Sequence, residues 1–163
     1  MITNIYFDWG NTLGKPKHKD IFIYGSNKKT RLSALYPDSL ETLKYLKKKG
    51  YKIGIISNSS KTTNQMIEGL LKNDMLDLFE GAIIATNGKN ICKKGCTEVF
   101  HKALLTDQVF PQNAVMVGNN YKKDIIGARN VGMHTIYIKR PNMLPGGLEC
   151  ARIKNIEELQ CLL

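Results

Sequence analysis

Asp8 is the residue of this sequence best suited to covalent chemistry, because it ends a run of apolar and aromatic residues. The run Ile-Tyr-Phe at 5–7 predicts a buried strand, and the Gly-Asn-Thr that follows Trp9 predicts a turn. Open α/β sheets keep their sites at the carboxyl ends of the strands, so a carboxylate here is placed to act as a nucleophile. Gly10, two residues later, leaves Asp8 as the only acid of this segment.

Polar residues also end two further strand-like runs. Ser57 and Asn58 follow the second run, at a point where we expect a helix to begin, and the N–H groups of a helix start favour an anion such as phosphate. The fourth run ends in Gly-Asn-Asn at 118–120, and Asp124 follows in the first turn of the next expected helix. Its carboxylate could turn back toward Asp8, which would bring two acids together.

Lys94 precedes an expected helix that contains Glu98, so its ammonium group could point at the same site. Each of these residues also has an ordinary structural explanation. Asp8 could be a turn residue, Ser57 or Asp124 a helix cap, and Lys94 an exposed surface lysine. Their order along the chain, rather than any one of them, favours a phosphate site.

Strand-like and helix-like segments alternate along the chain, which is the order of a parallel sheet covered by helices. Strands are expected at 2–7, 51–56, 82–85, 114–117 and 135–138, and helices at about 38–49, 66–71, 97–105, from 123, and after 155. Asp38 and Asn155 are the expected N-caps, and Gly50 the expected stop of the first helix. We therefore predict one α/β domain over residues 1–163, a three-layer Rossmann-like fold with a five-stranded parallel sheet and helices on both faces. Residues 14–36 are expected to form a short flap with a hairpin at 21–25, and 139–150 a loop.

The composition favours anionic partners, because 24 Lys and Arg against 14 Asp and Glu give a formal charge of +10. The lysine clusters lack interleaved aromatic residues, which indicates solvated faces rather than a dedicated nucleic-acid surface. The sequence shows no apolar stretch of about 20 residues and no leader, so we expect a cytoplasmic protein without a membrane span. The four cysteines lack CxxC spacing and are expected to be reduced.

Taken in order, these motifs resemble the four motifs of the haloacid dehalogenase (HAD) superfamily. The resemblance consists of the strand ending at Asp8, the strand ending in Ser57, Lys94 before its helix, and Val-Gly followed by Asp124. Gly-Ala at 127–128 and Gly-Met at 132–133 extend it, so that it runs from residue 2 to about 138.

The resemblance implies a hydrolase in which Asp8 attacks phosphorus to give an aspartyl-phosphate. It assigns Ser57 to the transferring phosphoryl group, with Asn58 beside it. Lys94 would hold the nucleophile and the phosphate together, as both a catalytic and a phosphate-binding residue. It also implies Mg²⁺, with these ligands: Asp8, the backbone carbonyl of Gly10, Asp124 and, as a further candidate, Asn119.

Two positions depart from the family's pattern. Gly10 replaces the acid/base aspartate of most family phosphatases, a group typically worth ~10²–10⁴-fold in rate. Asn119 replaces the usual first acid of the fourth motif, from which we expect weaker but not abolished Mg²⁺ binding.

The segment between Thr12 and Tyr36 is too short for the large helical cap of the metal-free dehalogenases, so the chain resembles the capless phosphatase-like branch. The open sites of this branch suit large substrates or phosphates at chain ends, or rely on a partner subunit for closure. The expected partner is a phosphorylated anionic substrate, and a homo-oligomer stays open. The leading hypothesis is a magnesium-dependent phosphomonoester phosphatase. The alternative is a catalytically impaired phosphate- or partner-binding protein on the same fold, and a dehalogenase ranks third.

Overall fold

Six parallel strands form the middle layer of the fold in the computed structural model, in the order β3-β2-β1-β4-β5-β6. The structure describes residues 1–15, 35–59, 61–86, 96–139 and 151–163. Within these ranges the strands are β1 (Asn4–Phe7), β2 (Lys52–Asn58), β3 (Ile83–Thr86), β4 (Ala114–Gly118), β5 (His134–Ile138) and β6 (Ala151–Ile153). In the central strand, Phe7 pairs with Ile55 of β2 and Val117 of β4. Asp8 therefore leaves the sheet between the carboxyl ends of its two neighbours.

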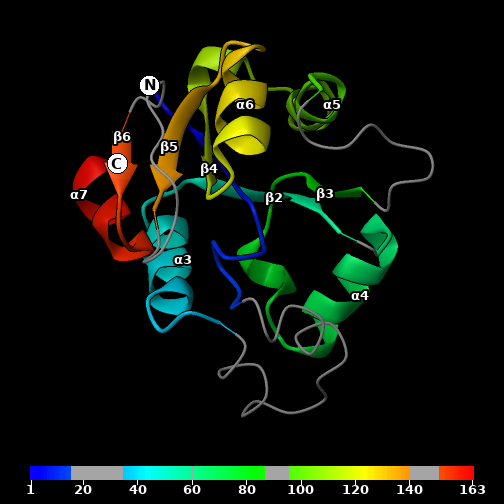
Figure 1. Cartoon of the computed structure of the whole chain (residues 1–163). Helices are drawn as coiled ribbons and strands as arrows, with labels where there is room; N and C mark the ends of the chain where they lie inside the picture. Colours follow the sequence, from blue (N-terminus) through cyan, green and yellow to red (C-terminus); the bar gives the residue numbers. More distant parts are fainter. Residues whose placement is uncertain (16–34, 60, 87–95, 140–150) are drawn as a thin grey trace.

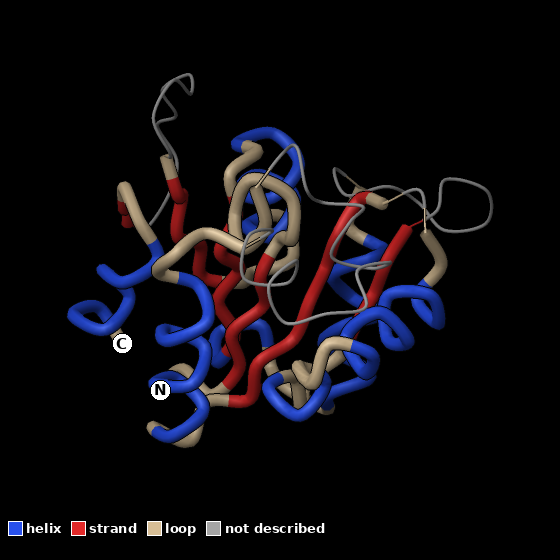
Figure 2. Tube along the Cα trace, turned by 90° about the horizontal axis from the view of Figure 1, so that it is seen from below, coloured by secondary structure: helices blue, strands red, loops and turns tan. Residues whose placement is uncertain are grey.

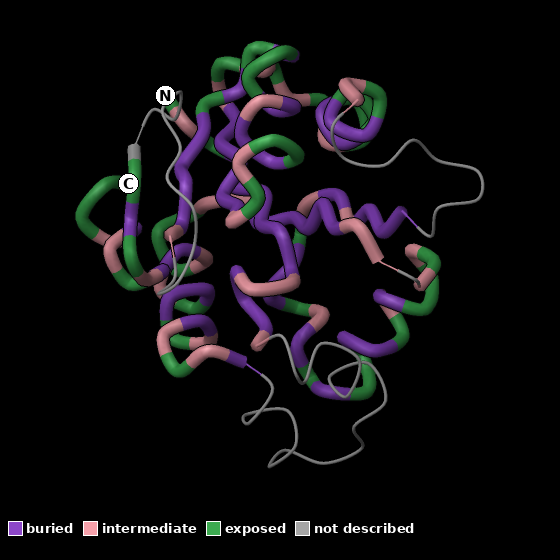
Figure 3. Tube along the Cα trace, in the orientation of Figure 1, coloured by how far each residue is buried: buried purple, intermediate pink, exposed green. Residues whose placement is uncertain are grey.

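The sheet is buried on both faces, because successive side chains of each strand point to opposite sides. In β1, Ile5 and Phe7 belong to one core cluster and Tyr6 to the other. This double burial explains why the strands read as nearly continuous apolar runs, and Figure 3 shows β2 and β4 as mostly buried.

Helices cover both faces of the sheet, as Figures 1 and 2 show. The core cluster around Phe7 includes residues of α3 (Ser39–Lys48), α4 (Thr63–Lys72) and α7 (Leu159–Leu162). The cluster around Tyr6 includes residues of α5 (Glu98–Asp107) and α6 (Gly127–Arg129). Shorter helical turns are η2 (Leu76–Leu78), η3 (Pro111–Asn113), η4 (Tyr121–Ile126) and η5 (Ile156–Glu158). The three-layer α/β fold expected from the sequence is confirmed.

The expected number of strands was wrong by one. The five expected strands are present within two residues at each end, but β6 adds a sixth by pairing with β5. This edge strand has only three residues, Ala-Arg-Ile, and so carries too little periodicity to be recognised. The expected hairpin at 21–25 lies outside the described residues.

The expected caps have different outcomes. Gly50 ends the first helix with φ +89, and Asn155 forms a capping box with Glu158, as expected. Asp38 precedes α3, but its side chain does not cap that helix; its Oδ2 accepts a hydrogen bond of 2.6 Å from the backbone N–H of Ile156. Asp38 thus ties α3 to the start of η5.

The expectation that all four cysteines are reduced was also wrong, because Cys96 is disulfide-bonded, whereas Cys161 is free and exposed. Within the described residues, no helix has both the length and the apolar character needed to cross a bilayer.

Candidate active site

Asp8 is held at the end of the central strand by both its backbone and its carboxylate. Its backbone N–H donates to the carbonyl of Val117 at 2.9 Å, which continues the pairing of β1 with β4 for one residue. The side chain is buried, and Thr12 Oγ1 donates to Asp8 Oδ2 at 3.3 Å. The strand end and the turn together fix the direction of the carboxylate.

The turn that follows brings Thr12 back onto Asp8. The carbonyl of Trp9 accepts backbone hydrogen bonds from Thr12, Leu13 and Gly14, at 3.4, 3.1 and 2.9 Å. Asn11 takes a left-handed conformation, φ +62, which asparagine tolerates better than most residues. Thr12 is fully buried and was missed as a site residue from the sequence, although its position four residues after the acid, across a predicted turn, was a usable signal.

Asn119 brings its side-chain amide to Asp8 and to the backbone of Gly10. One terminal atom of the amide lies 3.0 Å from Asp8 Oδ2 and 2.9 Å from the Gly10 carbonyl oxygen. Both neighbours are acceptors, so the hydrogen bonds are satisfied when the amide nitrogen occupies this position. With the oxygen there instead, Thr12 Oγ1 donates to Asn119 Oδ1 at 3.3 Å. The structure thus brings together three of the expected metal ligands.

Asp124 lies beside the end of β4. It belongs to the π-helical turn η4 and is fully buried, and its Oδ2 accepts a hydrogen bond of 2.9 Å from the backbone N–H of Asn120. A Cβ at Gly118 would come within 2.4–2.5 Å of three atoms of the Asp124 side chain, so this approach requires glycine at the strand end. The carboxylate therefore turns back onto the residue next to Asn119, and its expected approach to Asp8 stays a prediction.

Ser57 and Asn58 stand at the end of β2, next to β1. Ser57 is buried, and Asn58 accepts a hydrogen bond of 2.9 Å from Thr86 Oγ1, the last residue of β3. The expectation that a helix begins directly after Asn58 was wrong, because α4 starts at Thr63 and its first turn is capped by Thr62.

Lys94, the expected cation of the site, lies outside the described residues. The helix that follows it, α5, begins at Glu98, and both Val99 and Phe100 are buried against the sheet. Lys94 therefore stays a prediction.

The residues at this edge of the sheet fit a hard divalent cation. Mg²⁺ takes octahedral oxygen ligands at 2.0–2.1 Å, so neighbouring ligand oxygens lie about 2.9 Å apart. The Asn119 amide position lies at this separation from Asp8 Oδ2 and from the Gly10 oxygen. Among the described residues no three His, Cys, Asp or Glu side chains gather as a metal cluster, so a site here would need the amide and the carbonyl.

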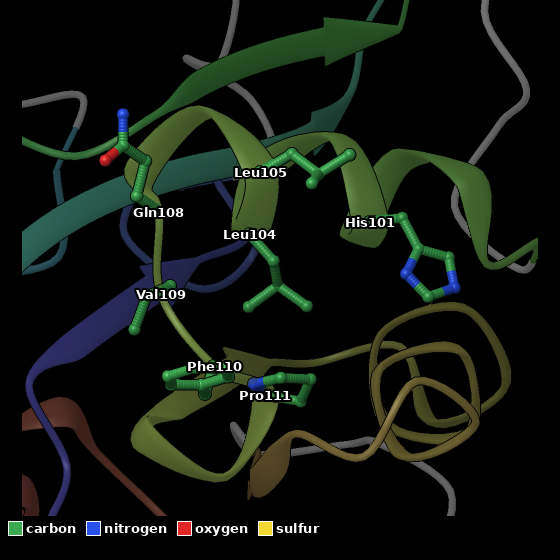
Figure 4. A pocket seen from close by; sticks show the side chains of 7 residues that line it. All are labelled: His101, Leu104, Leu105, Gln108, Val109, Phe110 and Pro111. Carbon is green, nitrogen blue, oxygen red and sulfur yellow. The ribbon is translucent and has the colours of Figure 1, made fainter.

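A concavity of about 420 Å³ is lined by residues of α5 and of the segment that leads to β4 (Figure 4). Its lining is apolar except for His101 and Gln108. It lies near the C-terminal end of α5, whose last residue, Asp107, accepts a hydrogen bond from the N–H of Ala82 and pairs with Lys52 at the start of β2. The pocket is thus at the amino end of the sheet, away from Asp8.

Comparisons with known proteins agree with the fold and the order of these residues. The family model described as "Haloacid dehalogenase-like hydrolase" matches residues 7–138. A glyceraldehyde 3-phosphate phosphatase of Pyrococcus furiosus is 36% identical over 119 residues, 73% of this chain and 48% of that protein. The protein of the same name from Methanothermobacter thermautotrophicus is 31% identical, over 84% of this chain and 62% of its own length. The chain spans about half the length of the curated relatives it matches.

Solved structures match the whole described fold. An uncharacterized protein from Listeria monocytogenes serotype 4b superposes with a TM-score of 0.78 and 26% identity, over 99% of this chain and 97% of that chain. A HAD phosphatase from Thermococcus onnurineus has the same TM-score and coverage at 21% identity, which supports the fold alone.

Proposed function

This chain belongs to the haloacid dehalogenase-like hydrolase family, and we propose that it is a magnesium-dependent phosphatase that hydrolyses phosphomonoesters through an aspartyl-phosphate on Asp8. The observation that supports this proposal best is the ring of oxygen-bearing groups around Asp8. Thr12 holds its carboxylate at 3.3 Å, and the Asn119 amide lies within 3.0 Å of both Asp8 and the Gly10 carbonyl.

In the proposed reaction a carboxylate oxygen of Asp8 attacks the phosphorus atom, and the bond from phosphorus to the ester oxygen breaks. The released alkoxide takes a proton, and water then hydrolyses the aspartyl-phosphate to inorganic phosphate and regenerates Asp8. Covalent capture divides one difficult displacement into two easier ones. Ser57 would bind the transferring phosphoryl group, and Lys94 would neutralise part of its charge.

Asp8, the Gly10 carbonyl, Asn119 and Asp124 would hold Mg²⁺. When bound, the ion would neutralise phosphate charge, which is the main catalytic requirement of phosphoryl transfer. The described side chains contribute mainly by holding Asp8 in place before the substrate arrives.

A phosphorylated anion is the proposed substrate class. The formal charge of +10 would raise the local concentration of such anions. Relatives named glyceraldehyde 3-phosphate phosphatase and pyrophosphatase PpaX support a phosphorylated substrate without identifying it. We further propose a single domain with a short flap over about 14–36, and a cytoplasmic location.

A second candidate function rests on Gly10. Among the described residues, no atom lies within 4 Å of a Cβ built at this position, so these residues leave room for a side chain where the chain has no acid. Without it position 10 supplies no proton to the leaving alkoxide. The alternative is therefore a phosphate- or partner-binding protein that has lost most of its turnover; a dehalogenase ranks below both.

Phosphatase activity of pure protein on a panel of phosphomonoesters, with Mg²⁺ and with a chelator, would test the proposal. The matched control is Asp8→Asn, which keeps the size of the side chain and can keep its contacts with Thr12 and Asn119. We expect Mg²⁺-dependent release of phosphate that Asp8→Asn abolishes. Equal, slow hydrolysis by both proteins would favour the binding protein instead.

A further inference from the structure

We propose that the Asn119 amide takes the place of the cation when the site holds no metal, and that it rotates by about 180° about its Cβ–Cγ bond when Mg²⁺ binds. In the first orientation its nitrogen donates to the nucleophile, and in the second its oxygen faces the metal. This inference rests on the metal site of the proposed function, and it assigns Asn119 as a positioning residue that acts through Asp8.

The first step is the pair of contacts of the amide. The same terminal position lies 3.0 Å from Asp8 Oδ2 and 2.9 Å from the Gly10 oxygen. Both are hydrogen-bond acceptors and one carries a formal charge, so a donor here is stabilising and a third acceptor is repulsive. In the metal-free protein the nitrogen therefore occupies the position.

The second step is that the same distances suit a ligand oxygen. Oxygens on adjacent corners of a Mg²⁺ octahedron lie about 2.9 Å apart, close to the two observed separations. A cation near Asp8 and the Gly10 carbonyl reverses the preference of the amide, since it attracts the oxygen and repels the N–H groups. A rotation about one side-chain bond exchanges the two atoms without moving the backbone, but it also turns the NH₂ group toward neighbours that are all donors, so metal binding must offset this cost.

The Thr12 hydroxyl can form a hydrogen bond in both orientations, so the rotation does not leave it without an acceptor. The hydroxyl oxygen lies 3.3 Å from Asp8 Oδ2 and 3.3 Å from the amide position of Asn119. A hydroxyl can donate one hydrogen bond and accept others, so it can donate to Asp8 while it faces an N–H group, or donate to the Asn119 oxygen.

An aspartate at 119 cannot make this exchange. Without metal it would place a second charge about 3.0 Å from Asp8 and would supply no donor to the Gly10 carbonyl. With metal it would add a charged ligand and would have no hydrogen bonds to give up. Asparagine thus lowers the affinity for Mg²⁺ and stabilises the metal-free nucleophile.

The experiment compares wild type, Asn119→Asp and Asn120→Asp. Asn120 is the matched control, because it is exposed, adds the same charge one residue away, and caps Lys123 through a side-chain oxygen that aspartate also has. Thermal unfolding midpoints with and without Mg²⁺, and Mg²⁺ titration by calorimetry, are measured for all three proteins.

We expect Asn119→Asp to lower the metal-free midpoint by about 4 °C or more and to bind Mg²⁺ at least about tenfold more tightly than wild type. Asn120→Asp should change neither quantity to this extent. If the two variants behave alike, general charge explains the effect and the exchange is refuted.

A second measurement on wild type decides the question even if Asn119→Asp does not fold. The side-chain NH₂ signals of Asn119 in a ¹⁵N spectrum should shift and exchange faster with solvent when Mg²⁺ is added, because they leave Asp8 and Gly10. Unchanged signals at saturating Mg²⁺ would overturn the inference while leaving the phosphatase proposal intact. Conversely, a protein with these metal responses but no hydrolysis would refute only the phosphatase.

Discussion

Restoring an acid at position 10 tests whether the missing proton donor limits the reaction. We expect Gly10→Asp to raise the rate of phosphomonoester hydrolysis by up to ~10²–10⁴-fold, which corresponds to about 2.7–5.5 kcal/mol of transition-state stabilisation. The described part of the structure permits the change, because none of its atoms lies within 4 Å of a Cβ at Gly10 and the backbone there is not left-handed. The new carboxylate adds charge near Asp8, so saturating Mg²⁺ is required.

The leaving group separates proton donation from other effects of the substitution. An alkyl phosphate releases a strongly basic alkoxide that needs a proton, whereas a nitrophenyl phosphate releases a stable anion that does not. A general acid at position 10 should therefore accelerate the alkyl ester far more than the nitrophenyl ester. Steady-state kcat for both esters is the assay.

Gly10→Asn is the control, since it has nearly the same size and polarity as aspartate but cannot transfer a proton in this way. Equal rates for Gly10→Asp and Gly10→Asn would refute the reasoning, and so would equal acceleration of both esters. In either case the acid would not be what the site lacks.

Two further substitutions test the supports of the site and of the sheet. Gly118→Ala forces a Cβ to within 2.4–2.5 Å of the Asp124 side chain. We expect it to lower the free energy of unfolding, measured by chemical denaturation, by about 1–3 kcal/mol and to weaken Mg²⁺ binding. The control Gly10→Ala should do neither. Tyr6→Phe removes the 2.6 Å hydrogen bond to the nearly buried Asp107 carboxylate. We expect this change to lower the free energy of unfolding by about 1–3 kcal/mol near pH 7. Burial, then the hydrogen bond and charge of Asp107, raises the pKa of Tyr6 above its ordinary value of 10.0, so its neutral form stabilises the fold below about pH 10 and this contribution is lost as the pH rises further. The loss of wild-type stability above pH 10 should be smaller in Tyr6→Phe, and identical alkaline profiles would contradict the assignment.

The strand ends could be predicted because local pattern determines them. An apolar run buried on both faces stops where its first polar residue appears, which located Asp8, Ser57 and the residues after Val117 from composition and spacing alone. Topology then required these ends to share one edge of the sheet. The supporting contacts of Thr12 followed from a turn whose geometry the sequence only suggested.

Contacts between distant segments could not be predicted in this way. Asp38 had every local sign of a helix cap, yet its carboxylate binds the N–H of Ile156, 118 positions away. β6 exists only because β5 offers it a partner, since three residues have no strand signal of their own. In both cases a contact with a residue or strand distant in the sequence determined the structure, and the local sequence did not.

Gly10 and Asn119 are best understood together, as a reduction of charge around one nucleophile. The family's pattern has acids at both positions, beside those at 8 and 124, and four carboxylates at one strand edge repel one another unless a cation is bound. This chain keeps two carboxylates and places a neutral amide between Asp8 and the Gly10 carbonyl. On the proposal made above, replacing these two acids would stabilise the site without metal and would lower both its affinity for Mg²⁺ and its supply of protons. On this proposal the two residues would slow turnover and would also let the nucleophile remain ordered between metal-binding events, so a low rate of hydrolysis and a well-formed site are consistent with each other.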